Sequence, residues 1–196
     1  MRKKSHISLS RYLIHNMDKR ELETHKKAFY IGSILPDCVP SFITRRHTYD
    51  ETFYIVKNEM NSLIDDFDEE EGIDRKFCRR LGIITHYIAD YFTYPHNSIF
   101  EGNMKDHCQY ENILKHRLKE YIQSHTANQD RAQEVRFTST EDIFRFISNN
   151  HERYLNTIKE IKVDIEYIVN ICFQVVDALI RLVELSLENR LIPQSV

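Results

Sequence analysis

Two histidines and an aspartate lie close together between Thr85 and His96, in the stretch THYIADYFTYPH. Imidazole nitrogens and carboxylate oxygens are ligands that zinc accepts in proteins. His86 and Asp90 are four positions apart, so on a helix they are neighbours on one face. Taken alone, such a pair is more often found on a solvent-exposed face, and a metal site requires partners from elsewhere in the chain.

A second histidine and carboxylate with the same spacing follow at His107 and Glu111. At about 100° per residue, both fall inside or beside an apolar stripe, and we therefore expect both side chains to be buried. A buried carboxylate without a partner costs several kcal/mol or must be neutralised, so a cation is expected beside Glu111. An ordinary buried Glu–His or Glu–Arg contact is the alternative to a metal ion. The stripe consists of Tyr110, Ile113, Leu114, Leu118 and Tyr121.

Three more candidates come from the first part of the chain. His6 lies within the inward stripe of the first helix, whereas His15 points about 180° away from it. Asp37 and His47 lie in or at the end of the segment GSILPDCVPSFITRRH, whose two prolines must interrupt the helix. A rigid loop of this kind can hold a carboxylate toward a site.

Taken together, these side chains form the nitrogen and oxygen ligand set of zinc, and they are too many for one tetrahedral ion. Two or three metal ions fit their number. A di-iron bundle would instead require Glu-x-x-His pairs on facing helices, and the sequence contains none. The set comprises five histidines and three carboxylates, namely His6, Asp37, His47, His86, Asp90, His96, His107 and Glu111.

The elements that must position these residues are helices. Gly and Pro number only four each and charged residues make up 29%, which favours helix over strand. A chain of 196 residues suits a single domain, with the metal ligands in 1–115 and scaffold helices in 126–192. We expect an all-α, single-domain multi-helix bundle. Helical periodicity covers about 5–17, 20–31, 50–66, 74–94, 104–125 and 140–190, the last segment being broken near Lys162.

Other features exclude several classes of protein. The four cysteines lack a C-x-x-C spacing, so they read as reduced thiols. No apolar signal core and no stretch of about 18 uncharged apolar residues is found, so a cytoplasmic protein without a membrane span is expected. The net charge of −3 gives no electrostatic case for a nucleic acid as the main partner. The histidines at 125 and 151 lie among polar neighbours and are expected to be solvated, and the acidic run 65–74 is expected to be a loop in which Asp74 caps the next helix.

The ordered motifs resemble the bacterial zinc-dependent phospholipase C enzymes and, more distantly, the fungal zinc nucleases that cleave single strands. The resemblance rests on SH at His6, PD at Asp37 and RRH at His47. It continues with H-x-x-x-D-x-x-x-x-x-H from His86 to His96, and with H-x-x-x-E from His107 to Glu111. The long central run followed by H-x-x-x-E is specific, and the matched region covers residues 1 to about 115.

The resemblance implies a division of the ligands among the metal ions. Asp37, His47, His86 and Asp90 would bind one zinc. A second zinc would be bound by His96, His107 and Glu111. Asp90 would also bridge to a third zinc, which His6 and the amino group and carbonyl of Met1 would complete.

The beginning of the chain departs from the pattern of this family. Secreted members expose a tryptophan at the mature N-terminus, whereas this chain begins MRKKSH. Two interpretations stay open. Arg2 should hinder removal of Met1, whose amine has a reference pKa of about 8 and could act as a ligand near neutral pH. Alternatively, the third metal is absent or loosely bound.

The implied activity is zinc-dependent hydrolysis of phosphodiester bonds, as in a phospholipase C acting on phospholipid head groups through a zinc-bound hydroxide. Asp37 is the carboxylate considered as a proton acceptor. One alternative is a zinc nuclease or nucleotidase on single-stranded nucleic acid, which needs a basic groove with stacking aromatics. Another is a helical protein that binds zinc without catalysis, because metal sites often serve folding alone.

Overall fold

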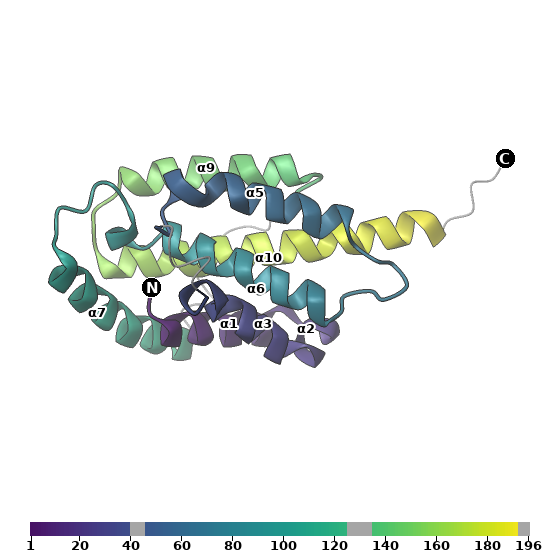
Figure 1. The fold of residues 1–196 in the computed structure, drawn as a ribbon, viewed down its shortest axis with the longest axis horizontal. Coiled ribbons are helices and arrows are strands. Elements are labelled where there is room, and N and C mark those ends of the chain that lie inside the picture. The colour runs from purple at the N-terminus through teal and green to yellow at the C-terminus, as the bar shows by residue number, and fades with distance from the viewer. Residues whose placement is uncertain (40–45, 125–134, 192–196) are drawn as a thin grey trace.

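The computed structural model describes residues 1–39, 46–124 and 135–191 of the chain. All the regular secondary structure assigned within these ranges is helical, as the composition predicts. Figure 1 shows them as an elongated bundle. The elements are α1 (Lys3–Met17), α2 (Arg20–Thr24), α3 (Lys26–Ile34), the 3₁₀ turn η1 (Leu35–Asp37), α5 (Tyr49–Asp65), α6 (Arg75–Tyr91), the 3₁₀ turn η2 (Tyr94–His96), α7 (Met104–Gln123), α9 (Thr140–Leu155) and α10 (Ile161–Leu191).

The helix boundaries follow the sequence signals with two refinements. The predicted helix 20–31 is divided at His25, which leaves the helical conformation with φ −102° and ψ 19°. The last predicted segment breaks just before Ile161, close to the expected position. There the Lys159 ammonium donates to the carbonyls of Tyr154 and Leu155 at 2.7 and 2.8 Å, and so satisfies two groups that the end of α9 leaves unpaired.

The start of α6 is fixed by the acidic segment that precedes it. The Asp74 side chain accepts a hydrogen bond from the Phe77 backbone N–H at 2.7 Å. This is the N-cap that the sequence predicts, and it confirms the loop assignment of the acidic run. Helix α6 therefore begins at a defined residue, and this start decides on which face of the helix each later residue lies.

Helix α6 is the central element of the bundle and packs against α3, α5 and α10 (Figure 1). Its closest approach is to α3, at Gly82 and Gly32. A Cβ atom on Gly82 would lie 2.3 Å from the Phe29 carbonyl oxygen, and one on Gly32 would lie 2.0 Å from the Arg79 carbonyl oxygen. The two backbones can approach this closely only because both positions lack a side chain.

Helix α7 lies at one edge of the bundle, against α1, α10 and η2. Only Leu114 and Leu118 are fully buried on it. Ile113, which the predicted stripe includes, is 42% exposed in the described part of the chain. The buried face of α7 is therefore narrower than the sequence suggests.

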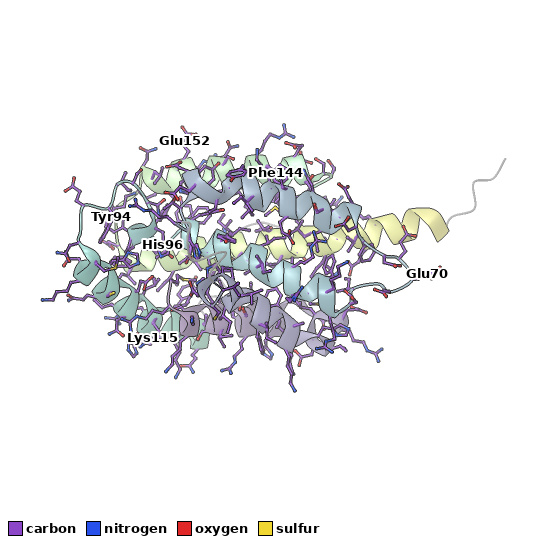
Figure 2. All side chains as sticks on the ribbon, in the orientation of Figure 1. Glu70, Tyr94, His96, Lys115, Phe144 and Glu152 are labelled. Carbon is purple, nitrogen blue, oxygen red and sulfur yellow. The ribbon has the colours of Figure 1, made fainter. Side chains whose placement is uncertain are left out.

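The buried residues of the hydrophobic core extend along the chain from Met1 to Val183 on α10. Figure 2 shows His96 within the bundle and the carboxylates of Glu70 and Glu152 on its outer surface. No helix in the described part of the chain is long and apolar enough to cross a membrane. The expected scaffold helices correspond to α9 and α10, and the predicted solvation of His125 lies outside the described residues.

Candidate metal centre

His86 and Asp90 project from the last turns of α6 and are both 0% exposed. The interpretation of this pair as a surface pair is therefore wrong. The helical face that carries them lies against α3, where the Gly32–Gly82 contact brings the Ser33 carbonyl within 2.9 Å of His86 Nδ1. Since a carbonyl can only accept, Nδ1 carries the proton and Nε2 is left with a free lone pair.

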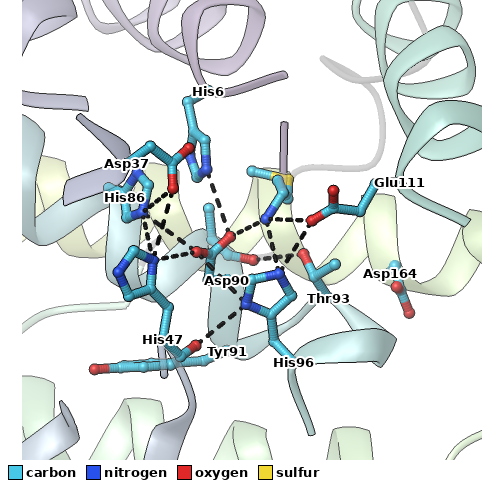
Figure 3. Close-up of polar contacts among 12 residues, drawn as sticks. His6, Asp37, His47, His86, Asp90, Tyr91, Thr93, His96, Glu111 and Asp164 are labelled. Atoms are coloured by element: carbon cyan, nitrogen blue, oxygen red, sulfur yellow. Dashed lines mark hydrogen bonds and ion pairs between the residues drawn. The ribbon is translucent and has the colours of Figure 1, made fainter. Parts of the chain in front are cut away.

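His47, His86 and Asp90 form what we call the buried group. Their nitrogen and oxygen atoms converge: His47 Nδ1 lies 3.0 Å from His86 Nε2, and these atoms lie 3.2 and 3.3 Å from Asp90 Oδ2. The Asp37 carboxylate, at the end of η1, lies 3.9 Å from His47 and 3.8 Å from His86. Three separate segments of the chain thus meet at the end of α6 (Figure 3).

His96, His107 and Glu111 form a second group, which we call the open group. His96 ends the turn η2, and the other two residues lie one helical turn apart on α7. Glu111 Oε1 lies 3.2 Å from His96 Nε2 and 3.1 Å from His107 Nε2. The three side chains are 13%, 26% and 13% exposed in the order of the chain, so the expected burial of His107 and Glu111 is only partial.

His6 and Met1 approach Asp90 from the side of α1. His6 is 1% exposed, its ring stacks on His86 at 3.9 Å, and its Nε2 lies 3.4 Å from Asp90 Oδ1. That nitrogen has no hydrogen-bond partner among the described residues. The Met1 amine contacts Asp90 Oδ1 and lies 3.0 Å from His96 Nε2 and 3.3 Å from Glu111 Oε1. Met1 N therefore lies between Asp90 and the open group.

The electrostatics of the cluster centre on Asp90. Burial favours its neutral form, but His96, the Met1 amine and His86 hold the pKa of Asp90 well below its usual range. In the same way, burial opposes charge on the Met1 amine, yet Asp90 and Glu111 raise its pKa. Burial, with a smaller effect of the adjacent His86, lowers the pKa of His6 to about 3. The inward ring of His6 is thus a neutral nitrogen donor at physiological pH.

The open group shows a similar balance. Burial alone would raise the pKa of Glu111, but hydrogen bonds from His107 and His96 lower it strongly. Burial lowers the pKa of His96. An ionised carboxylate beside a neutral imidazole is the protonation state in which both side chains bind a metal ion.

The residues present fit zinc. With bonds of about 2.0 Å, neighbouring ligands of a tetrahedral zinc ion lie roughly 3.3 Å apart. The separations of 3.0 to 3.3 Å in the buried group match that value, as do those of 3.1 and 3.2 Å in the open group. The unpaired Nε2 of His6 is a further buried donor aimed at the cluster. Imidazole and carboxylate are also the chemical classes that zinc accepts.

An open pocket of about 560 Å³ adjoins the cluster. It is bounded by the segment that carries His47 and by the loop that leads from η2 to α7. His47, His96 and His107 reach its wall, together with Phe100 and the carboxylates of Asp50 and Glu51. A volume of this size falls in the range of small-molecule sites, and the pocket wall includes His47 of the buried group and His96 and His107 of the open group.

Two buried polar residues near the site, His151 and Asp164, were not predicted from the sequence. His151 is 5% exposed, stacks on Tyr49 at 4.1 Å and lies 2.9 Å from the Asn97 Oδ1, so its predicted solvation is wrong. Asp164 is 0% exposed and accepts hydrogen bonds from Tyr94, Tyr110 and Tyr154. Polar sequence neighbours concealed His151. Asp164 lies four and seven positions before the buried residues Ile168 and Ile171, and this helical spacing was a usable signal.

Comparison with protein families gives one result. The sequence model described as zinc dependent phospholipase C matches residues 5–161, a range that contains every candidate ligand except Met1. Comparisons with curated proteins and with solved structures find no match.

Proposed function

Because the chain belongs to the zinc-dependent phospholipase C family, we propose that it hydrolyses the phosphodiester bond between the glycerol and the head group of a phospholipid. The observation that carries this proposal is the convergence of the buried group and the open group on Asp90, beside an open pocket of about 560 Å³. A phosphate ester in that pocket would lie against His47, His96 and His107.

We assign the buried group and Asp37 to one zinc ion and the open group to a second. Zinc ions supply Lewis acidity: they lower the pKa of water toward about 7 and stabilise negative charge on phosphate oxygens. Backbone carbonyl groups orient two of these ligands. The Ser33 carbonyl fixes the ring of His86, and the His47 carbonyl, 3.3 Å from His96 Nδ1, does the same for His96.

Asp37 is also the carboxylate that we assign as proton acceptor. Its side chain is 23% exposed, whereas Asp90 is fully buried. Its oxygen lies 3.8 to 3.9 Å from the two histidines of the buried group, farther than Asp90 Oδ2. A carboxylate that lies at this longer distance and is partly open to solvent is the one that we assign to accept a proton.

The test compares two substitutions of the same type on α7. Glu111→Gln removes an open-group ligand, while Glu120→Gln alters an exposed carboxylate of the same helix. The zinc-loaded chain and both variants are assayed on phosphatidylcholine vesicles, on a chromogenic phosphocholine ester and on a labelled single-stranded oligonucleotide. We expect ester and lipid turnover that a chelator abolishes, with activity reduced by about 100-fold or more in E111Q and unchanged in E120Q.

Other outcomes of this experiment favour different functions. Cleavage of the oligonucleotide alone would point to a nuclease. Full zinc occupancy without turnover of any substrate would leave a protein in which zinc stabilises the fold, and it would overturn the proposed hydrolase activity. The cytoplasmic location stays a prediction.

A third zinc ion, bound by His6, Asp90 and Met1, is part of the same proposal. The Met1 amine and His6 Nε2 both face Asp90 Oδ1. Elemental analysis of the chain with and without a short N-terminal extension tests this assignment. If the amine of Met1 is a ligand, the extension should remove about one zinc per chain, since it converts that amine to an amide. Equal zinc content would exclude Met1.

A further inference from the structure

Asp164 is a buried carboxylate outside the region that the family model matches. It lies in the first turn of α10 and accepts three hydrogen bonds. The Tyr154 hydroxyl donates to Oδ1 at 2.7 Å, while the Tyr110 hydroxyl and the Tyr94 backbone N–H donate to Oδ2 at 2.9 and 2.8 Å. A fully buried carboxylate is costly unless its oxygens are satisfied in this way, so its presence in a scaffold helix requires an explanation.

The three donors come from three different elements. Tyr94 opens η2, two residues before His96, and Tyr110 directly precedes Glu111 on α7. Tyr154 belongs to the end of α9, which contributes no candidate ligand. A single oxygen of Asp164 therefore joins the turn that carries His96 to the helix that carries Glu111. Figure 3 shows Asp164 on the Glu111 side of the cluster, away from His86.

We propose that Asp164 is a positioning residue, which holds η2 and α7 at the separation at which His96, His107 and Glu111 bind one zinc ion. This inference rests on the assignment of the open group as a zinc site in the proposed function. His96 and Glu111 come from separate elements, and their ligand atoms must stay about 3.2 Å apart. Metal sites require ligands held to within about 0.5 Å, so a bond to both elements acts directly on affinity.

A purely structural role for Asp164 gives a different expectation, and two matched variants separate the roles. Tyr110→Phe and Tyr154→Phe each remove one hydroxyl that donates to the same buried carboxylate. Both should lower thermal stability by similar amounts. Only Tyr110 links Asp164 to the helix of the open group, so only Y110F should loosen that zinc. Asp164→Asn replaces one acceptor oxygen by an NH₂ group, which cannot accept a hydrogen bond.

The experiment uses the zinc-loaded full chain and measures the rate at which each zinc passes to a chelator. The absorption spectrum of the cobalt-substituted chain reports the ligand geometry. We expect D164N and Y110F to release one zinc about 10- to 100-fold faster than the unmodified chain and to change the cobalt spectrum. Y154F should keep the original release rate and spectrum despite its lower melting temperature.

Faster release in Y154F to the same extent as in Y110F would overturn the inference, because release would then follow stability alone. An unchanged rate in D164N would overturn it as well. His107→Ala serves as the reference for the ion concerned. Zinc content that H107A leaves unchanged would refute the open group as a zinc site, and the proposed ligand set would then fail together with this inference.

Discussion

The buried group and the open group use the same kinds of ligand in different surroundings. His86 and Asp90 of the buried group are 0% exposed, and they are enclosed by α3, α1 and the segment before α5. In the open group, His107 is 26% exposed, and His96 and His107 face the pocket. The comparison separates two tasks. His86 and Asp90, enclosed in the core, would couple metal binding to folding, whereas His47, His96 and His107 at the pocket wall would leave room for a substrate.

The largest effect on the two groups is expected from the substitution of Asp90, which contacts residues of both groups. Asp90→Asn should reduce the free energy of unfolding of the zinc-loaded chain by about 3–5 kcal/mol, because a buried charged partner is lost to the Met1 amine and to His47. Denaturant unfolding and elemental analysis measure the effect. The control is Glu152→Gln, an exposed carboxylate on α9. Retention of all zinc ions by D90N would contradict the central role of Asp90.

A pH titration of the metal-free chain tests the contact of His151 with Asn97, the residue that follows His96 of the open group. Burial lowers the pKa of His151 to about 4, whereas the unfolded value is about 6.5. The unfolded chain thus binds the proton more readily, so the contribution of His151 to stability is complete above about pH 6.5 and is lost as the pH falls toward 4. The loss should reach about 3 kcal/mol.

The measurement for His151 is the free energy of unfolding at several pH values, compared with His151→Gln. The variant should show a shallower fall in stability between pH 6.5 and 4, because it lacks the titrating group. Equal slopes in the two chains would mean that His151 is accessible to protons in the folded state.

Substitution of Gly82 tests the buried group separately from the open group, because Gly82 lies at the contact of α6 with α3 that positions His86. Gly82→Ala would place a Cβ atom 2.3 Å from the Phe29 carbonyl oxygen, so α3 and α6 must separate. We expect a loss of about 1–3 kcal/mol in the free energy of unfolding. The bond from His86 to the Ser33 carbonyl should weaken as well, and with it the zinc affinity of the buried group.

The control for Gly82→Ala is Ser33→Ala, which keeps the backbone carbonyl that orients His86. S33A should bind zinc as the unmodified chain does. Zinc titrations of both variants give the comparison, and unchanged affinity in G82A would show that the close approach of α3 and α6 does not position His86.

The smallest effect on stability is expected at the open group. His107→Ala should change the free energy of unfolding of the metal-free chain by about 0.5 kcal/mol or less, since the side chain is partly exposed. It should nevertheless remove about one zinc ion per chain and the activity. The exposed His116, on the same helix, is the matched control. A large loss of stability in metal-free H107A would contradict the distinction between the two groups.

Much of the fold was predictable from the sequence, because amphipathic periodicity and capping residues act locally. The inward position of His6 followed from the spacing of its apolar neighbours, and the N-cap at Asp74 followed from its place before α6. The positions of Asp37 and His47 near the cluster followed from the order of motifs alone, since loop residues have no periodicity.

The parts that could not be predicted depend on contacts between distant segments. A helical wheel of α6 places His86 opposite the apolar residues Leu81, Ile84 and Ile88. The wheel contains no information about α3, which covers the face of His86. His151 lies among polar residues in the sequence, yet its ring stacks on Tyr49 from α5. In both cases tertiary packing decides burial, and one helix considered alone cannot show it.

The position of Asp90 also bears on how the chain folds. Its partners Met1 and His47 are 89 and 43 residues away in the sequence, and Met1 lies 95 residues from His96. Contacts of such long range require the closure of long loops, so we expect them to form after the local helices. We therefore expect the complete metal cluster to form only in the last stage of folding, when α1 docks on α6 and α7. A chain still leaving the ribosome, with α7 unfinished, would lack a complete zinc site.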